Sequence, residues 1–253
     1  MIPKRIIARL DIKGPDVVKG FQLEGVKSVG FPDILARKYY NENIDEIIYI
    51  DSVASLYGRN NIFSVVEKAA NEIFIPLTVG GGIRSINDFS LALSSGADKV
   101  AINTAACHNP KLVENAAKTF GSQCVVCSVQ AMKQSNDLEW EALTDNARER
   151  TGKNVIDWVK QLESLGAGEI LLTSVKNEGC KNGFDIELYK EVNNKVKIPV
   201  IAHACAGNSE HIIELFKEIN VDAVALASVL HYDILSIQYI KEALSNEGFL
   251  VRI

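Results

Sequence analysis

Three consecutive glycines and two small polar residues form the part of this sequence that is best suited to bind an anion. The glycines 80–82 follow an apolar run at 75–79, and Asn103 and Thr104 follow a second apolar run at 99–102. Because glycine has no Cβ, backbone N–H groups at these positions can approach a ligand closely. An alternative reading is a tight turn without a ligand. We interpret the following residues as half of a phosphate-binding site: Gly81, Gly82, Asn103 and Thr104.

The segment between these two groups has the pattern of a helix. Ser85 and Asp88 have the spacing of a capping box at a helix start, and Gly96 stands where the helix should end. The resulting strand–helix–strand unit places the glycines and the polar pair at the carboxyl ends of neighbouring strands. Helix N-termini also favour anions, which supports the phosphate interpretation.

The same strand–helix–strand unit recurs about half a chain later. Three pairs of segments correspond: 45–49 with 168–172, 75–79 with 198–202, and 97–104 with 221–228. Self-similarity on this scale indicates two copies of a half-domain. If each half contains four strand–helix units, the whole chain contains eight.

The chain has 253 residues, the size of one α/β barrel, and no linker divides it. Helical patterns alternate with eight runs that are predicted to be strands: 5–12, 46–50, 75–79, 99–102, 123–130, 169–174, 198–202 and 221–228. We therefore predict an α/β fold, a single (β/α)8 TIM barrel over residues 1–253 with an internal half-barrel duplication. Ser209 is expected to cap the seventh helix, and the last helix is expected over 234–245.

Chemistry in such barrels takes place at the carboxyl ends of the strands. The residues expected there are Asp11, Asp51, 80–82, Asn103, Gln130, Ser174, 203–205 and Ser228. Two long connections are expected on the same side. One follows the first strand, carries Lys19 and is a candidate lid, and the other is the polar stretch 133–154.

Composition excludes several classes of partner. A net charge of −5 argues against a nucleic-acid partner, which requires a basic surface. The first residues lack an apolar signal region, and no run reaches membrane-spanning length, so we expect a cytoplasmic protein with no membrane partner. The odd number of cysteines, five, suits a reducing compartment. His203, Cys205 and Cys180 offer three metal ligands without a fourth, and we expect no metal and no cofactor.

Several segments together resemble one family. They are 5–14, 17–20, 80–82, 97–106, 120–123 and 166–174. In these segments, and over essentially its full length, the chain resembles the cyclase subunits of imidazole glycerol phosphate synthase, from the histidine pathway.

The resemblance implies an ammonia-using barrel. A partner glutaminase would dock at the N-terminal face of the barrel and release ammonia, which would pass through the barrel. The acceptor would be a bis-phosphate substrate, a phosphoribulosyl-formimino aminoimidazole carboxamide ribotide, held between two phosphate sites. Cyclisation and cleavage would give imidazole glycerol phosphate and an aminoimidazole carboxamide ribotide.

The resemblance also assigns roles to residues of this sequence. The catalytic positions would be Asp11, Gln130 and Lys19. Substrate and phosphate binding would fall to Asp51, Gly81, Gly82, Asn103, Thr104, Ser174, Glu178, Gly179, Gly207 and Ser228. A ring of four charges across the barrel floor would gate the passage of ammonia: Arg5, Glu46, Lys99 and Glu169. The same four charges can also be read as a salt-bridged plug.

Three positions depart from the family pattern. Gln130 stands where the family has its second catalytic carboxylate, and an amide cannot exchange protons as a carboxylate does. The segment 203–205, His-Ala-Cys, replaces a glycine pair at the second phosphate cradle. Arg9 replaces a small neutral residue, and its buried guanidinium is expected to pair with Asp11 or Asp51.

These departures leave two alternatives open. The chain could be a paralogue that passes ammonia to a different acceptor, such as a sugar intermediate for surface polysaccharide. It could also be a barrel that activates a glutaminase without chemistry of its own.

Overall fold

The computed structural model describes residues 2–54, 62–134 and 139–252. Eight parallel strands form a closed ring, because the pairing of β10 with β7 joins the two ends of the strand order. Around the ring the order is β10 (Glu169–Ser174), β11 (Val200–His203), β12 (Ala223–Leu226), β1 (Arg5–Lys13), β4 (Glu46–Asp51), β5 (Leu77–Gly80), β6 (Lys99–Ile102) and β7 (Val125–Lys133). The predicted (β/α)8 barrel is confirmed.

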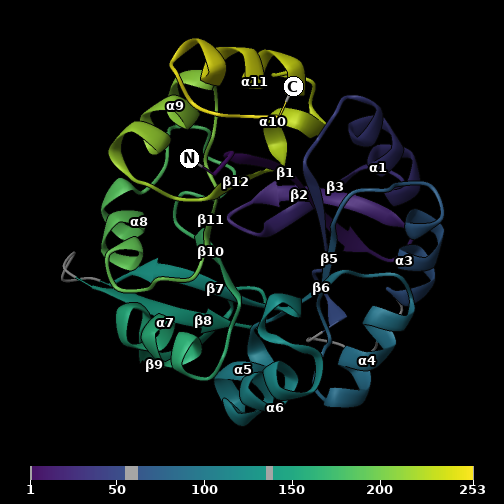
Figure 1. Ribbon diagram of the computed structural model, residues 1–253, viewed down its shortest axis with the longest axis vertical. Helices are drawn as coiled ribbons and strands as arrows, with labels where there is room; N and C mark the ends of the chain where they lie inside the picture. Colours follow the sequence, from purple (N-terminus) through teal and green to yellow (C-terminus); the bar gives the residue numbers. More distant parts are fainter. Residues whose placement is uncertain (1, 55–61, 135–138, 253) are drawn as a thin grey trace.

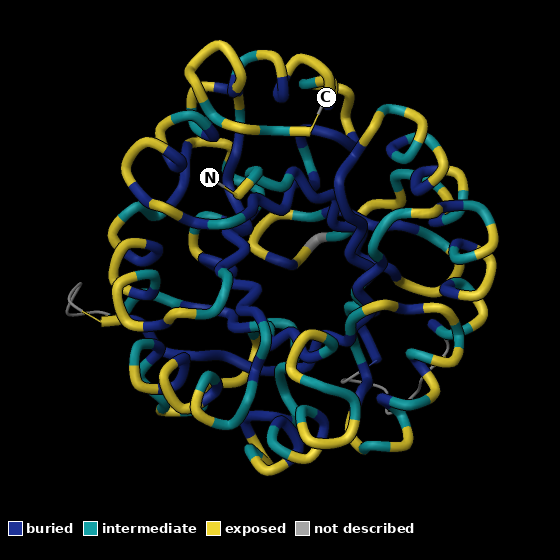
Figure 2. The backbone as a smooth tube through the Cα atoms, in the orientation of Figure 1, coloured by how far each residue is buried: buried dark blue, intermediate teal, exposed yellow. Residues whose placement is uncertain are grey.

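Helices surround this ring of strands (Figure 1). The outer helices are α1 (Pro32–Asn41), α3 (Phe63–Ala70), α4 (Ile86–Ser94), α6 (Lys111–Phe120), α7 (Val155–Ser164), α8 (Ile186–Asn193), α9 (Ser209–Glu218) and α11 (Ile237–Asn246). Shorter segments are α5 (Thr104–His108), α10 (Ser228–His231) and the 3₁₀ turn η1 (Ser122–Cys124). Figure 2 shows buried backbone in the ring and exposed backbone on the outer side of the helices.

The helix boundaries confirm some local predictions and correct others. Ser85 and Asp88 form the predicted capping box at the start of α4. The predicted cap of α9 is wrong: the side chain of Asn208 accepts the N–H of His211, which makes Ser209 the first helical residue. The last helix also begins three residues later than predicted, after the cap Ser236.

Both long connections contain β-hairpins and are not plain loops as predicted. The first comprises β2 (Asp16–Phe21) and β3 (Glu24–Gly30), and β2 pairs antiparallel with β1. The second comprises β8 (Trp140–Thr144) and β9 (Glu149–Asn154), and β8 pairs antiparallel with β7.

The first of the two hairpin turns has no sequence signal, whereas the second contains Asp145 and Asn146, residue types that are common in turns. The first turns through Gln22 and Leu23 with φ of 51° and 65°, and neither residue type is a usual turn former. The second turns through residues 145–147, which all have positive φ, with an alanine in the last place.

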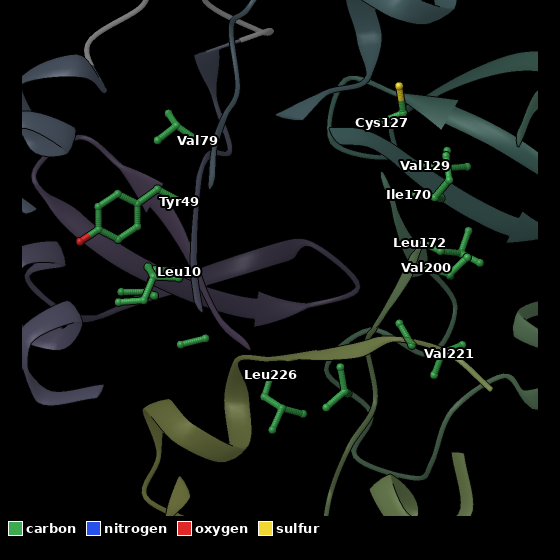
Figure 3. Close-up of a cluster of buried hydrophobic side chains, with 14 of the residues drawn as sticks. Leu10, Tyr49, Val79, Cys127, Val129, Ile170, Leu172, Val200, Val221 and Leu226 are labelled. Carbon is green, nitrogen blue, oxygen red and sulfur yellow. The ribbon is translucent and has the colours of Figure 1, made fainter. Parts of the chain in front are cut away.

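The core has two layers because alternate side chains of each strand point to opposite sides of the ring. The outer layer packs against the helices and includes Leu10, Val79 and Leu172 (Figure 3). The inner layer fills the lumen and consists of Ile7, Ile48, Ala101, Val126, Leu171, Ile201, Ala223 and Ala225.

The half-barrel repeat is visible in the strand order and in the hairpins. β1 and β7 are four places apart in a ring of eight, so they face each other across the lumen, and each is followed by an antiparallel hairpin. Arg9 and Asp11 of β1 therefore have Ser128 and Gln130 of β7 as their counterparts.

Candidate active site at the barrel mouth

A cavity of about 520 Å³ opens at the carboxyl ends of the strands β4 to β7. Its wall contains predicted residues from four strand ends: Asp51, Gly81, Gly82, Asn103, Thr104 and Gln130. Gly81 has φ of 94°, and a Cβ at this position would lie 2.3 Å from the carbonyl oxygen of Asp51. Only glycine fits here, because the backbone packs closely against Asp51, and Gly81 and Gly82 line the cavity.

The β8–β9 hairpin holds the polar side chains of this cavity in place. Asn103 Nδ2 donates to the carbonyl oxygen of Leu143 at 3.1 Å. The N–H of Asp145 donates to Thr104 Oγ1, also at 3.1 Å. The Thr104 oxygen accepts the bond from the hairpin turn, so its hydroxyl hydrogen can still be donated to a ligand oxygen.

Asp11 lies buried in an ion pair with Arg9. Arg9 Nε and Nη2 both lie 2.9 Å from Asp11 Oδ1, which confirms the first of the two partners predicted for Arg9. Burial favours the neutral carboxyl, but Arg9 and then Lys19 outweigh it and hold the pKa of Asp11 below its ordinary value. Asp11 is thus ionised and able to accept a proton.

Arg9 continues from Asp11 across the lumen to two other strands. Its Nη1 donates to Thr173 Oγ1 at 3.2 Å and to His203 Nδ1 at 3.0 Å. A guanidinium is only a donor, so His203 Nδ1 is an acceptor and the ring is neutral. Burial and then Arg9 lower the pKa of His203 well below its ordinary value.

Lys19 reaches the site from the β2–β3 hairpin. Its ammonium group pairs with Glu178 and lies 3.9 Å from Asp11 Oδ2. Burial lowers the pKa of Lys19 to about 8, with Asp11 opposing the shift. Glu178 also accepts the N–H of Leu23 at 2.9 Å, so one carboxylate fixes both the hairpin turn and the lysine.

Gln130 is held by the second hairpin. Its Oε1 accepts the N–H of Ala147 at 2.8 Å, and the side chain lines the mouth cavity. Gln130 and Asp11 belong to opposite strands of the ring. Gln130 lines the larger cavity at β7, whereas at β1 the lining residue is Arg9, and its ion-pair partner Asp11 lies buried behind it and lines neither cavity.

The second predicted cradle is almost filled. The cavity there has a volume of only about 20 Å³, and its lining includes Glu178, Gly179 and Ser228. Ala204 and Cys205 keep φ values of 102° and 81°, the region that favours glycine, and the Cys205 sulfur contacts the carbonyl oxygen of Asn177. The backbone thus retains the form of a glycine cradle while side chains occupy its space.

Two residues predicted to bind substrate lie outside both cavities. Ser174 points to the helix side of β10, where its hydroxyl donates to Asp185 at 3.4 Å, and Thr173 is the neighbour that faces the lumen. Gly207 instead allows close packing, since a Cβ there would lie 2.0 Å from the carbonyl oxygen of Lys181. Side chains alternate along a strand, so the sequence shows that Thr173 and Ser174 point to opposite faces of the sheet. It does not show which of the two points into the lumen.

Three residues that line the mouth were not predicted from the sequence. Arg84, Ser128 and Asn146 all belong to the wall of the larger cavity. Ser128 was identifiable in principle, because it lies two residues before Gln130 on the same face of β7. Asn146 was not, since its position depends on the unpredicted hairpin.

At the opposite end of the barrel the four predicted charges form a closed ring. Arg5 pairs with Glu46 at 2.8 Å and with Glu169 at 2.5 Å. Lys99 pairs with the same two carboxylates, at 3.0 Å and 3.1 Å. Burial disfavours the charge on Arg5, but Glu169 and Glu46 outweigh it and raise the pKa of Arg5.

Other classes of site are not found in the described part of the chain. No group of three or more His, Cys, Asp or Glu side chains within 2–54, 62–134 and 139–252 is arranged to hold a metal ion. Among the helices that the structure describes, none combines the length and the apolar character needed to cross a membrane.

The fold and the site define a (β/α)8 barrel protein with a glycine-lined cavity at its mouth and a ring of charges at its floor. Sequence comparison specifies the family. The profile of the histidine biosynthesis protein family matches residues 5–236, and the chain belongs to this family.

Three similar relatives carry the name imidazole glycerol phosphate synthase subunit HisF. The chain is 55% identical to the protein of that name from Legionella pneumophila over 206 residues, 81% of this chain and 97% of the relative. It is 46% identical over the full length of both chains to those from Bacillus cereus (strain Q1) and Clostridium botulinum (strain Okra / Type B1).

Proposed function

We propose that this chain is the cyclase subunit of an imidazole glycerol phosphate synthase. It uses ammonia from a partner glutaminase to convert a phosphoribulosyl-formimino aminoimidazole carboxamide ribotide to imidazole glycerol phosphate. The observation that carries the proposal is the pairing of a glycine-lined cavity at the mouth with a closed ring of four charges at the floor. The names of the full-length relatives support the same reaction.

In this proposal the two sides of the mouth have different tasks. Asp11 is ionised and accepts a proton from the ammonia-derived nitrogen or from the substrate. Gln130 holds the substrate by donating from its amide nitrogen, because its oxygen is already used by Ala147. Lys19 neutralises negative charge next to Asp11, and residues 81, 82, 103 and 104 bind one phosphate.

We also place the glutaminase on the face where the strands begin. Exposed apolar side chains gather there: Phe74 is 79% exposed and precedes β5, and Ile2 is 79% exposed and precedes β1. Two surface depressions of about 350 Å³ and 290 Å³ lie beside these residues. Exposed apolar groups around a charged ring are suited to a protein interface. Docking there would deliver ammonia directly to the ring.

The test is turnover by the purified chain. We expect the ribulosyl substrate and an ammonium salt to give imidazole glycerol phosphate without any partner, and glutamine to replace the salt once a glutaminase is added. Asp11→Asn should abolish both activities. A chain that stimulates glutamine hydrolysis but forms no product with ammonium would instead be a non-catalytic activator.

A further inference from the structure

Arg9 divides the lumen of the barrel. Its side chain leaves β1 and is held by Asp11, by Thr173 of β10 and by His203 of β11, and it is only 2% exposed. To reach those strands it passes β12, where Ala225 pairs in register with both Ile7 and His203. Arg9 thus fills the lumen on the side of β1, β12, β11 and β10.

On the opposite side of the lumen, fewer side chains separate the charged ring at the floor from the cavity at the mouth. The mouth cavity is lined by Ala101 of β6 and Ser128 of β7 as well as by Arg9. Ala101 belongs to the inner apolar layer and lies two residues above Lys99 of the charged ring. At the rise of a parallel strand this separation is about 6.6 Å. A single alanine therefore stands between the ring and the cavity on β6.

A polar atom without a partner lies on this same side. Thr78 is inward-facing, since Leu77 and Val79 belong to the outer core layer, and it is in register with Lys99 of β6. Its Oγ1 is the one buried side-chain nitrogen or oxygen in residues 2–54, 62–134 and 139–252 without a hydrogen-bond partner. A buried hydroxyl in this state can bind a small molecule that both donates and accepts, as ammonia does.

We propose that Arg9 directs ammonia away from the barrel axis, along β6, past Ala101 and into the mouth beside Ser128 and Gln130. The inference rests on the proposed function and makes Arg9 a specificity-determining residue for the delivery of the nucleophile. The guanidinium is fixed by bonds to three partners and blocks the axial route, whereas neutral ammonia can pass the small apolar side chain of Ala101. The reacting carbon then lies on the β6–β7 side of the mouth.

The experiment compares two matched substitutions in two backgrounds. Ala101→Val narrows the proposed route, and Ala225→Val adds the same volume on the Arg9 side. Both are made in the parent and in Arg9→Ala. The readout is the ratio of glutamine-dependent to ammonium-dependent turnover in the complex with the glutaminase. This ratio cancels effects on the chemistry itself, because both reactions share the same chemical steps.

We expect Ala101→Val to lower this ratio roughly tenfold in the parent and Ala225→Val to change it less than about twofold, because close-packed interiors absorb added volume poorly. In Arg9→Ala the axis opens, so the effect of Ala101→Val should fall below roughly threefold. Thermal unfolding of each variant checks the fold. If Ala101→Val does not fold, Ala101→Cys replaces it as a smaller obstruction.

The outcomes separate the route from the function. Equal effects of the two substitutions in an active parent, or an Ala101→Val effect that persists in Arg9→Ala, would overturn the route and leave the reaction intact. A parent without turnover from either nitrogen source would overturn the proposed function, and the route with it.

Discussion

At the scale of single residues, Asp11 and Gln130 give the mouth two chemically unequal sides. They occupy equivalent places on β1 and β7, yet Asp11 is ionised beside Arg9 and Gln130 is an amide fixed by Ala147. Only one of the two can exchange protons near neutral pH. The steps that require a second acid or base must therefore use water or proceed slowly.

Restoring the second carboxylate should accelerate the reaction. We expect Gln130→Asp to raise the ammonium-dependent rate, by up to roughly 10²-fold, because a positioned acid or base typically contributes 10²–10⁴-fold. Arg9 keeps Asp11 ionised and limits this gain, so Gln130→Asp with Arg9→Cys should exceed the single change. Steady-state rates across pH 5 to 9 measure the effect, with Gln130→Asn as the uncharged control of equal length. Rates for Gln130→Asp no higher than for this control would show that position 130 is not a vacated catalytic position.

At the scale of elements, the loop between β11 and α9 keeps a backbone that its side chains do not suit. Ala204 has φ of 102°, whereas its neighbour Ala202 lies in the strand. We expect Ala204→Gly to raise the free energy of unfolding by about 1 kcal/mol, because it relieves a conformation that L-residues rarely adopt. Chemical denaturation measures the change. Ala202→Gly is the matched control and should lower stability, since glycine weakens a strand.

The same loop offers a test of the filled cradle. The parent should bind one equivalent of inorganic phosphate, at residues 81, 82, 103 and 104, because the second cavity holds only about 20 Å³. Ala204→Gly with Cys205→Gly should add a second equivalent in titration calorimetry. Binding of two equivalents by the parent would mean that the second cradle opens without help.

A second element, α10, connects to α1 and β1 through His231. Tyr39 Oη lies 2.7 Å from its Nδ1, and its Nε2 donates to the carbonyl oxygen of Arg9 at 3.1 Å. Burial, followed by the nearby Lys19, lowers the pKa of His231 to about 4. The folded protein therefore resists protonation of a ring that the unfolded chain protonates near pH 6.5.

This shift predicts a loss of stability in acid. Between pH 6.5 and about 4 the unfolded state binds the additional proton, so the free energy of unfolding falls with falling pH, by about 3 kcal/mol from this group. Urea denaturation at several pH values measures the slope. His231→Gln keeps a donor and an acceptor without a titratable ring, and it should remove most of this slope. An unchanged slope in the variant would assign the acid sensitivity to other groups, of which His203 is the first candidate.

How much of each element was predictable depended on its residues. The capping box of α4 and the alternation of strands and helices follow from local spacing, so the barrel and the position of the glycines at its mouth were predicted from the sequence. The first hairpin was not, because Gln22 and Leu23 give no turn signal and its pairing with β1 is a tertiary contact. The second was not either, although Asp145 and Asn146 are common turn residues, because its pairing with β7 is a tertiary contact. Two other features are also tertiary and could be seen only in the structure. They are the ion pair of Lys19 with Glu178 and the orientation of Thr173 into the lumen.

At the scale of the whole molecule, the floor ring and the mouth lie at opposite ends of the barrel. Lys99 is one of two cations that bind both acidic members of the ring. We expect Lys99→Glu to reduce glutamine-dependent turnover at least roughly tenfold, since three carboxylates would then face one arginine, and to leave ammonium-dependent turnover within about twofold. Asp11→Asn changes the mouth and not the floor, so it should abolish turnover while activation of the glutaminase persists. Unchanged glutamine-dependent turnover in Lys99→Glu would refute the gating role.

The meeting of the two hairpins above the mouth has a kinetic consequence. Asn146 of the second hairpin donates to the carbonyl oxygen of Leu23 in the first at 3.1 Å, and the N–H of Gln22 donates to the carbonyl oxygen of Glu178 at 3.0 Å. We expect that a long substrate crosses the mouth only after these contacts have separated. Its association rate should therefore become independent of concentration at high substrate, limited by the opening step. An inorganic phosphate ion needs only the open end of the larger cavity, and its association should stay proportional to concentration throughout.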